Sequence, residues 1–276
     1  MNDGQNLLLS DAEKVTLVQA EPGAARWVKP FLGAEEFIND IPRWCLWLKG
    51  CPPSELRTLP MISRRVAATK KYREASARVA TRKLADFASL FGEDRQPAQR
   101  YVLVPRHSSE RRAFIPMGFL EPETVCGDAN LCVADATLFD FGILSSTMHN
   151  AWVRYTCGRL KSDFRYSAGI VYNNFPWPLQ RVAQREAAVA AAAQAVLDIR
   201  AGHAGSSLAD LYDPNAMPPD LVKAHRELDR VVDAAYLAKL PSDLKSKPKL
   251  DSDAQRVAFL FVLYQQLSSM EEQPPT

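Results

Sequence analysis

The spacing of apolar and polar residues divides the chain into three stretches. Residues 1–59 carry short mixed elements, and the apolar run WCLWL at 44–48 is typical of a buried strand. A long helix is predicted from Ile62 to Leu84, because apolar residues recur there at helical spacing. The residues expected to face the core on this helix are Ile62, Val66 and Val79.

Short strands are predicted between Arg100 and Pro178. They are YVLV at 101–104, AFIPM at 113–117, LCVA at 131–134 and GIVY at 169–172. One helix interrupts them, beginning at a cap formed by Ser145 and Ser146 and ending at Gly158, a residue that commonly stops helices.

The last third of the chain is predicted to form three amphipathic helices. An alanine-rich helix ends at Gly202, a second begins at Pro218–Pro219, and a third begins at the capping box Ser252–Gln255. Three such helices joined by polar loops form a small bundle. We therefore expect an α+β fold: a mixed-sheet domain with flanking helices over residues 1–180, followed by a helical domain over residues 181–276.

Composition indicates an ordinary cytoplasmic globular protein. Of the 276 residues 47% are hydrophobic, and no apolar run reaches the roughly 18 residues that cross a bilayer. The N-terminal MNDGQNLLLSDAEK lacks the basic start and apolar stretch of a secretion signal. The five cysteines form no CxxC pair and suit neither a disulfide framework nor a zinc site. We expect reduced thiols, no metal and no membrane partner.

Positive charge is concentrated in one segment. The net charge is only +2, yet residues 63–112 hold thirteen Lys or Arg against five Asp or Glu. Four of these cations recur at helical spacing and would form one stripe about 27 Å long, namely Arg64, Lys71, Arg78 and Arg82. Such a stripe can follow DNA phosphates and release counterions, although a solvated helix face has the same pattern.

The loop at 105–112 (PRHSSERR) has side chains that suit phosphate contacts. Guanidinium groups and hydroxyls are gathered there, and both bind phosphate oxygens well. The residues concerned are Arg106, Ser108, Ser109, Arg111 and Arg112. An ordinary charged hairpin is the alternative interpretation.

The segment at 158–167 alternates charged with other residues. Arg159, Lys161, Asp163 and Arg165 alternate with Leu160, Ser162 and Phe164. In a single strand the four charged residues would therefore share one face. Lys and Asp side by side can address both bases of one pair, Lys at guanine O6 and N7 and Asp at cytosine N4. A row of surface salt bridges is the alternative.

The sequence contains no recognisable catalytic motif. GxGxxG, GxxxxGK[ST], HExxH and GxSxG are all absent, and NNFPW at 173–177 resembles the Asn-Pro-Pro-aromatic loop of adenine methyltransferases only superficially. His149 and His225 stand in no motif with a nucleophile, so we expect both to be core or interface residues. An independent enzyme would need a cofactor-binding motif that is not found.

Several long segments, in the same order, resemble the C-terminal part of MmeI-like type II restriction-modification enzymes. They are KPFLGAEEFIN, RWCLWL, RHSSERRAFIPMGFL, FGILSSTMHNAWVR, GRLKSDFRYSAGIVYNNFPWP, LADLYDPNAMPPDLVKAHRELDRVVDAAY and SDAQRVAFLFVLYQ, and they cover nearly the whole chain. The resemblance implies a target recognition domain with a helical tail. In such enzymes a nuclease, a helical spacer and an adenine-N6 methyltransferase precede these parts. We therefore expect no catalysis by this chain, with S-adenosylmethionine and Mg²⁺ bound only by upstream domains.

The resemblance also implies which residues read bases. In the family they occur in the strand that matches Lys161 to Arg165, Ser162 included, and in the loop that matches Asp128 and Ala129. We expect Lys161 and Asp163 to read one G·C pair at the end of the site away from the cut, with Arg165 and Ala129 at a neighbouring position. The expected phosphate contacts are Arg64, Lys71, Arg78, Arg82, Arg106, Ser108, Ser109, Arg111, Arg112 and Arg159.

Two functional hypotheses follow. In the first, the chain recognises double-stranded DNA for a methyltransferase domain of the same or a companion chain. In the alternative, it is a protein-interaction piece that docks on a separate methyltransferase subunit and reads DNA only in that complex. An exposed apolar patch around Trp27, Trp44 and Trp47 would favour the alternative.

Overall fold

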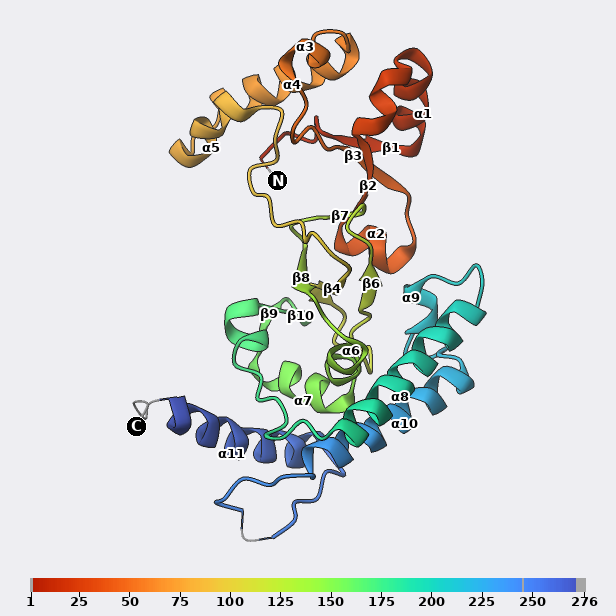
Figure 1. Cartoon of the computed structure of the whole chain (residues 1–276), viewed down its shortest axis with the longest axis vertical. Coiled ribbons are helices and arrows are strands. Elements are labelled where there is room, and N and C mark those ends of the chain that lie inside the picture. Colours follow the sequence, from red (N-terminus) through yellow and green to blue (C-terminus); the bar gives the residue numbers. More distant parts are fainter. Residues whose placement is uncertain (1, 245, 272–276) are drawn as a thin grey trace. The chain divides into compact units, whose positions relative to one another are not determined.

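The computed structural model describes residues 2–244 and 246–271. The chain forms two compact units: unit 1 is Met1–Arg100 with Leu120–Cys132, and unit 2 is Tyr101–Phe119 with Val133–Thr276. Three small sheets and a set of helices make up the described residues, which confirms the α+β class (Figure 1). No helix among these residues is both long enough and apolar enough to cross a bilayer.

Unit 1 is built on a four-stranded sheet of order β1-β3-β2-β7. Its strands are β1 (Leu8–Ser10), β2 (Val28–Leu32), β3 (Arg43–Leu46) and β7 (Val125–Cys126). Both β1 and β2 pair antiparallel with β3, and β2 pairs parallel with β7. The strand predicted at 44–48 is therefore confirmed as β3. Buried leucines and an isoleucine from β1, α1, β3 and α4 form the core, among them Leu9, Leu17, Leu46 and Ile62.

The helices of unit 1 are short except for two. They are α1 (Asp11–Ala20), η1 (Pro22–Trp27), α2 (Ala34–Asn39), α3 (Pro53–Leu56), α4 (Pro60–Glu74), α5 (Val79–Lys83) and η2 (Leu84–Phe87). The single helix predicted from 62 to 84 is wrong, because the chain leaves helical geometry between Glu74 and Val79. Val79, expected in the core, is 58% exposed.

Arg73 explains why the helix breaks. Its side chain is fully buried, and its guanidinium donates to four backbone carbonyls, those of Asn2, Leu84, Phe87 and Leu90, at 2.6, 2.9, 2.9 and 2.7 Å. Leu84 lies eleven residues after Arg73, which is about 16 Å along a straight helix. These bonds form only because the chain turns back after α4.

Unit 2 contains an antiparallel sheet of order β5-β10-β9, formed by β5 (His107–Ser108), β10 (Asp163–Arg165) and β9 (Gly158–Leu160). A third sheet has the order β6-β4-β8, formed by β6 (Gly118–Leu120), β4 (Tyr101–Pro105) and β8 (Asn130–Ala134). The chain passes between the units within β6 and β8. The strands predicted at 101–104 and 131–134 are confirmed as β4 and β8.

Two predicted strands are wrong. Residues 113–117 form no ladder because helix side chains bind their backbone groups: Ile115 N–H donates to Asn150 Oδ1 at 3.1 Å, and the carbonyl of Met117 accepts from Arg200 at 2.7 Å. Residues 169–172 lie in a π-helix, η3 (Ala168–Tyr172), in which Trp152 Nε1 donates to the carbonyl of Val171. Short apolar runs do not by themselves separate strands from helical turns.

The α-helices of unit 2 are α6 (Leu138–Leu144), α7 (Thr147–Thr156), α8 (Ala183–Gly202), α9 (Leu208–Leu211), α10 (Pro219–Tyr236) and α11 (Asp253–Glu271). Four of them were predicted, α7, α8, α10 and α11, whereas α6 and α9 were not. Ser146 caps α7, α8 ends at Gly202, and Ser252 Oγ accepts from the N–H of Gln255 in the first turn of α11. The four predicted helices are confirmed, as is the cap at Ser146. In the capping box predicted at Ser252–Gln255, Gln255 Oε1 accepts from the N–H of Asp251 and not from that of Ser252.

The C-terminal helices pack together and also onto earlier helices. α8 runs beside α10, and α11 packs against α7 (Figure 1). Gly142 of α6 meets α8, where an added Cβ would lie 2.7 Å from Val189 Cγ1, so only glycine permits this approach. Because α6 and α7 precede residue 180, unit 2 crosses the boundary expected there. A division into domains 1–180 and 181–276 stays a prediction.

Candidate nucleic-acid interface

The segment at 158–165 is a β-hairpin and not the single strand that we predicted. β9 and β10 pair antiparallel, with Leu160 opposite Asp163 and Arg159 opposite Phe164. Lys161 and Ser162 form the two-residue turn, and Lys161 adopts a left-handed backbone conformation with φ of 56°. The alternation in the sequence continues through the turn, which is why it suggested one strand.

The hairpin register corrects the prediction that four charged residues share one face. Directly opposite residues of an antiparallel pair point to the same side. An inner face therefore carries Arg159, Phe164 and Ser108, and an outer face carries Leu160, Asp163, Arg165 and His107. Phe164 and Ser108 are buried, whereas all four residues of the outer face are exposed.

Contacts of Arg159 and Asp163, one from each face, fix the hairpin to the loop at 105–112. Arg159 lies over the Phe164 ring, 4.3 Å from its centroid, and pairs with Glu110 at 3.3 Å. The N–H of Glu110 donates to Asp163 Oδ1 at 3.3 Å, so Asp163 also holds the loop. Arg159 thus has partners within the chain. Ser108 is 5% exposed, so its hydroxyl faces the interior and not a phosphate.

The outer face and the turn carry cations without partners. Within the described residues, the side chains of Lys161 and Arg165 make no hydrogen bond or ion pair, and both are exposed. Arg111 is likewise exposed in the neighbouring loop. Arg112 is half-buried, and burial lowers the pKa of its guanidinium, while Asp163 and Asp213 act in the opposite direction. The hairpin and the loop together therefore present a charged surface. Arg106 and Ser109 of the loop are half-buried.

Side chains of α7 and α10 hold the segment after this loop. Arg154 of α7 bridges two partners, donating to the carbonyl of Ala113 at 2.6 Å and to Asp253 of α11 at 2.7 Å. Phe114 stacks on His225 of α10 with ring centroids 3.9 Å apart. Burial lowers the pKa of His225 to about 3, so this imidazole is neutral. His149 is also buried and bonded to Tyr166, as expected of a core histidine.

Asp128 and Ala129 lie in unit 1, in the turn between β7 and β8. The carbonyl of Leu32 accepts from Gly127 N–H and from Asn130 Nδ2, both at 2.8 Å, which anchors the turn on β2. An added Cβ at Gly127 would lie 2.6 Å from the Phe31 ring, so glycine is required for this close approach. The turn is therefore held firmly at both ends.

The same turn lines a pocket of about 430 Å³ with an acidic wall. Glu35 and Glu36 of α2 line this pocket together with Asp128 and Ala129, and Tyr72 of α4 also lines it. Four carboxylates line the pocket, those of Asp3, Glu35, Glu36 and Asp128. Carboxylates repel phosphate and accept hydrogen bonds from amino groups. The surroundings of Asp128 therefore favour an amino group of a base over a phosphate of the DNA backbone.

The cations predicted to form one helical stripe lie on two helices. Arg64 and Lys71 are exposed on α4, Arg82 is on α5, and Arg78 caps α5. Arg82 donates to the carbonyls of Ser76 and Ala77 at 2.8 and 3.0 Å, so it stabilises the non-helical segment between α4 and α5. A straight stripe of 27 Å does not exist.

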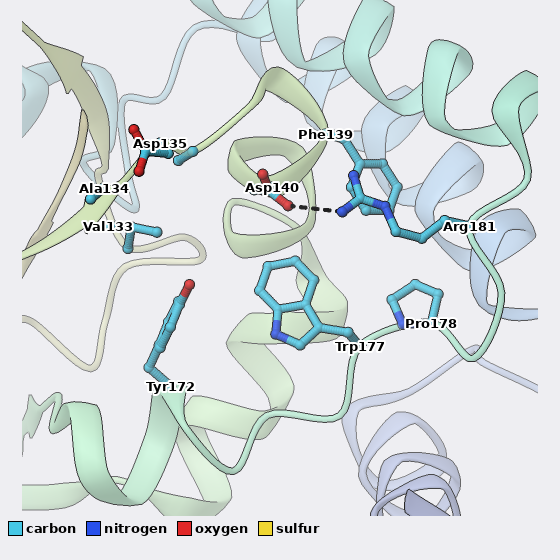
Figure 2. A pocket seen from close by; sticks show the side chains of 10 residues that line it. Val133, Ala134, Asp135, Phe139, Asp140, Tyr172, Trp177, Pro178 and Arg181 are labelled. Carbon is cyan, nitrogen blue, oxygen red and sulfur yellow. Dashed lines mark ion pairs between the residues drawn. The ribbon is translucent and has the colours of Figure 1, made fainter. Parts of the chain in front are cut away.

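A second pocket, of about 320 Å³, lies in unit 2 between β8, α6 and the segment that carries Tyr172 and Trp177 (Figure 2). The rings of these two residues are 6.3 Å apart and nearly perpendicular. Asp140 accepts from Thr137 in a capping box and lies 4.0 Å from Arg181, which also pairs with Glu186. Two of the pocket's three charged lining residues, Asp140 and Arg181, therefore have partners within the chain.

Two other sequence-based expectations concern surface and metal. Trp27, Trp44 and Trp47 are half-buried and pack against the core of unit 1, and the first two donate to Glu55 and Asp11. The exposed patch that would favour a docking role is thus not seen. Within the described residues, no three His, Cys, Asp or Glu side chains are grouped as metal ligands would be.

Comparison with known proteins defines the class. The family model "MmeI, target recognition domain" matches residues 1–179, and "MmeI, C-terminal domain" matches residues 181–271. These are the target recognition and C-terminal parts of restriction-modification enzymes. The chain belongs to the MmeI family.

Two relatives show how much of such a protein the chain represents. It is 36% identical over 267 residues to DNA methyltransferase A of Bacillus subtilis (strain 168), covering 97% of this chain and 29% of that protein. It also matches the solved structure of the Type IIL restriction-modification enzyme MmeI in complex with DNA, with 40% identity and a TM-score of 0.91 over 97% of this chain and 34% of that chain. The sequence thus spans about a third or less of either relative.

Proposed function

We propose that this chain recognises a specific sequence in double-stranded DNA on behalf of an adenine-N6 methyltransferase and performs no catalytic step itself. The observation that carries the proposal is the exposed hairpin of β9 and β10 in a member of the MmeI family. The side chains of its cations Lys161 and Arg165 have no partner within the described chain. Methyl transfer and cleavage would belong to domains that bind S-adenosylmethionine and Mg²⁺, in the same or a companion chain.

Lys161 supports this proposal through its backbone as well as its charge. A left-handed conformation costs a non-glycine residue roughly 1 kcal/mol, and glycine or asparagine would be the ordinary choice in this turn. Strained positions of this kind concentrate at functional sites. Lysine at this position presents an ammonium group at the tip of the hairpin, where it can enter a major groove.

The resemblance to the family supports our choice of base-reading residues, and exposure supports our choice of phosphate contacts. We assign base reading to Lys161, Ser162, Asp163 and Arg165, and to Asp128 with Ala129. Lys161 and Asp163 would read one G·C pair, with Arg165 and Ala129 at a neighbouring position. Phosphate contacts fall to the exposed cations Arg64, Lys71, Arg78 and Arg111, supported by Arg106, Ser109 and Arg112.

The first test is duplex binding by the purified chain across a salt series. Replacing Arg64 and Lys71 by alanine should make the plot of log K against log salt less steep by about 2, since each phosphate contact contributes roughly 0.9. The matched control is Lys223→Ala with Arg226→Ala, two exposed cations of α10 outside the proposed contacts. Lys161→Ala with Asp163→Ala should instead alter which sequences are preferred.

Each outcome has a clear meaning. Equal loss of slope in the α4 variant and in the α10 control would show that the attraction is not localised, and the phosphate assignment would be wrong. If no duplex binds even at low salt, the chain does not recognise DNA alone. The reading in which it docks first on a methyltransferase subunit would then replace this proposal.

A further inference from the structure

One apolar residue stands on the otherwise polar outer face of the hairpin. Leu160 is the last residue of β9, directly before the turn, and its side chain is 56% exposed. Phe164, the other apolar residue of the hairpin, is only 4% exposed because it lies on the inner face. The strand ladder therefore directs Leu160 away from the core that Phe164 joins.

The register places Leu160 beside the proposed base readers. It pairs directly with Asp163, and directly opposite residues have Cβ atoms about 5 Å apart. Successive bases along one DNA strand are about 3.4 Å apart. If Asp163 reads one base pair, Leu160 lies within reach of the next.

Only one group on the base edges of the major groove offers an apolar partner. Guanine, cytosine and adenine present donors and acceptors there, whereas thymine also presents its C5-methyl group. Burial of an exposed leucine against that methyl group removes apolar surface of both from water. Charged neighbours such as Lys161 cannot supply this contact.

From these observations we propose that Leu160 is a specificity-determining residue that contacts a thymine methyl group next to the base pair read by Lys161 and Asp163. The inference rests on the proposed function. It adds a preference for thymine at a position that the charged residues alone do not determine.

The test compares thymine with uracil, which differs only in lacking the methyl group. The preferred site of the wild-type chain is first selected from a pool of random duplexes. Each thymine of that site is then replaced by deoxyuridine, one at a time, and dissociation constants are measured for the wild type, Leu160→Ala and Leu160→Met. The matched control is Ile170→Ala, because Ile170 is equally exposed at 55% but lies on η3.

At one thymine we expect uracil to weaken wild-type binding about fourfold, the effect of burying a single methyl group. Leu160→Ala should reduce that ratio to about one, Leu160→Met should largely keep it, and Ile170→Ala should leave it unchanged. If uracil has no effect at any position, or if Leu160→Ala weakens binding while the ratio persists, the inference is wrong although DNA recognition stands. If no sequence is enriched, the proposed function fails and the inference with it.

Discussion

Arg73 offers a quantitative test of how unit 1 is held together. Its guanidinium binds four backbone carbonyls of three separate segments, the N-terminal residues, η2 and the residues after η2. In Arg73→Met the side chain would still fill much of the space, but the four carbonyls would lose their donor. A buried polar group left without a partner costs at least about 1 kcal/mol, so the free energy of unfolding should fall by about 4 kcal/mol.

The matched control is Lys71→Met. Lys71 lies two residues earlier on the same helix and is exposed, and its side chain has no partner within the described residues. Its replacement should change the free energy of unfolding by less than about 0.5 kcal/mol, as is usual for surface positions. Urea unfolding gives the total, and amide hydrogen exchange of α4 and η2 shows whether the loss lies in unit 1. A loss below about 1 kcal/mol in Arg73→Met would refute the reasoning.

The remaining predictions concern specificity and pH. Exchange of the proposed readers, Lys161→Glu together with Asp163→Arg, should change the preferred base at their position from G to C, because the carboxylate then meets the cytosine amino group. Selection from random duplexes measures this, and an unchanged preference would exclude the pair as readers. Burial raises the pKa of Asp233 to about 6, from an ordinary value of 3.8, although Arg256 opposes the shift. The folded state then binds the proton more tightly than the unfolded state, so this stabilising contribution is present below about pH 4 and lost as the pH rises through about 6. In Asp233→Asn this contribution should disappear, so wild type and variant should differ in free energy of unfolding more at pH 4 than at pH 6. Urea unfolding at both pH values measures this, and an equal difference at both would contradict the prediction.

The sequence predicted helices better than strands because the sequence pattern of a helix extends over more residues than that of a short strand. The helices that begin at Thr147, Pro219 and Asp253 have a cap or a proline at or just before their first position, and several turns of apolar periodicity. Residues 113–117 and 169–172 carry equally apolar side chains over only one or two turns. Their backbones are held by Asn150, Arg154, Arg200 and Trp152, residues far away in the sequence.

The candidate site, too, could be predicted only in part from the sequence. Charged residues of 158–165 could be identified from their chemistry, but the turn at Lys161 lacks the Asn-Gly or Asp-Gly signal of a tight hairpin. Without the turn, neither the two faces nor the place of Leu160 could be predicted. Arg73 is one of thirteen cations in its segment, and nothing in the sequence distinguishes the buried one from its exposed neighbours.

The contacts between the segment at 112–117 and the helices bear on how specificities could be exchanged within this family. The loop that faces the hairpin continues into Phe114 and Met117, which are held by His225 and Arg200 of the helical tail. A hybrid that joins residues 1–179 of one relative to the tail of another must therefore form this ring stack and this carbonyl contact between residues from different parents. Transfer of residues 101–119 together with the chain from Val133 onward keeps those partners as a set, whereas the turn at Asp128 can be exchanged with unit 1.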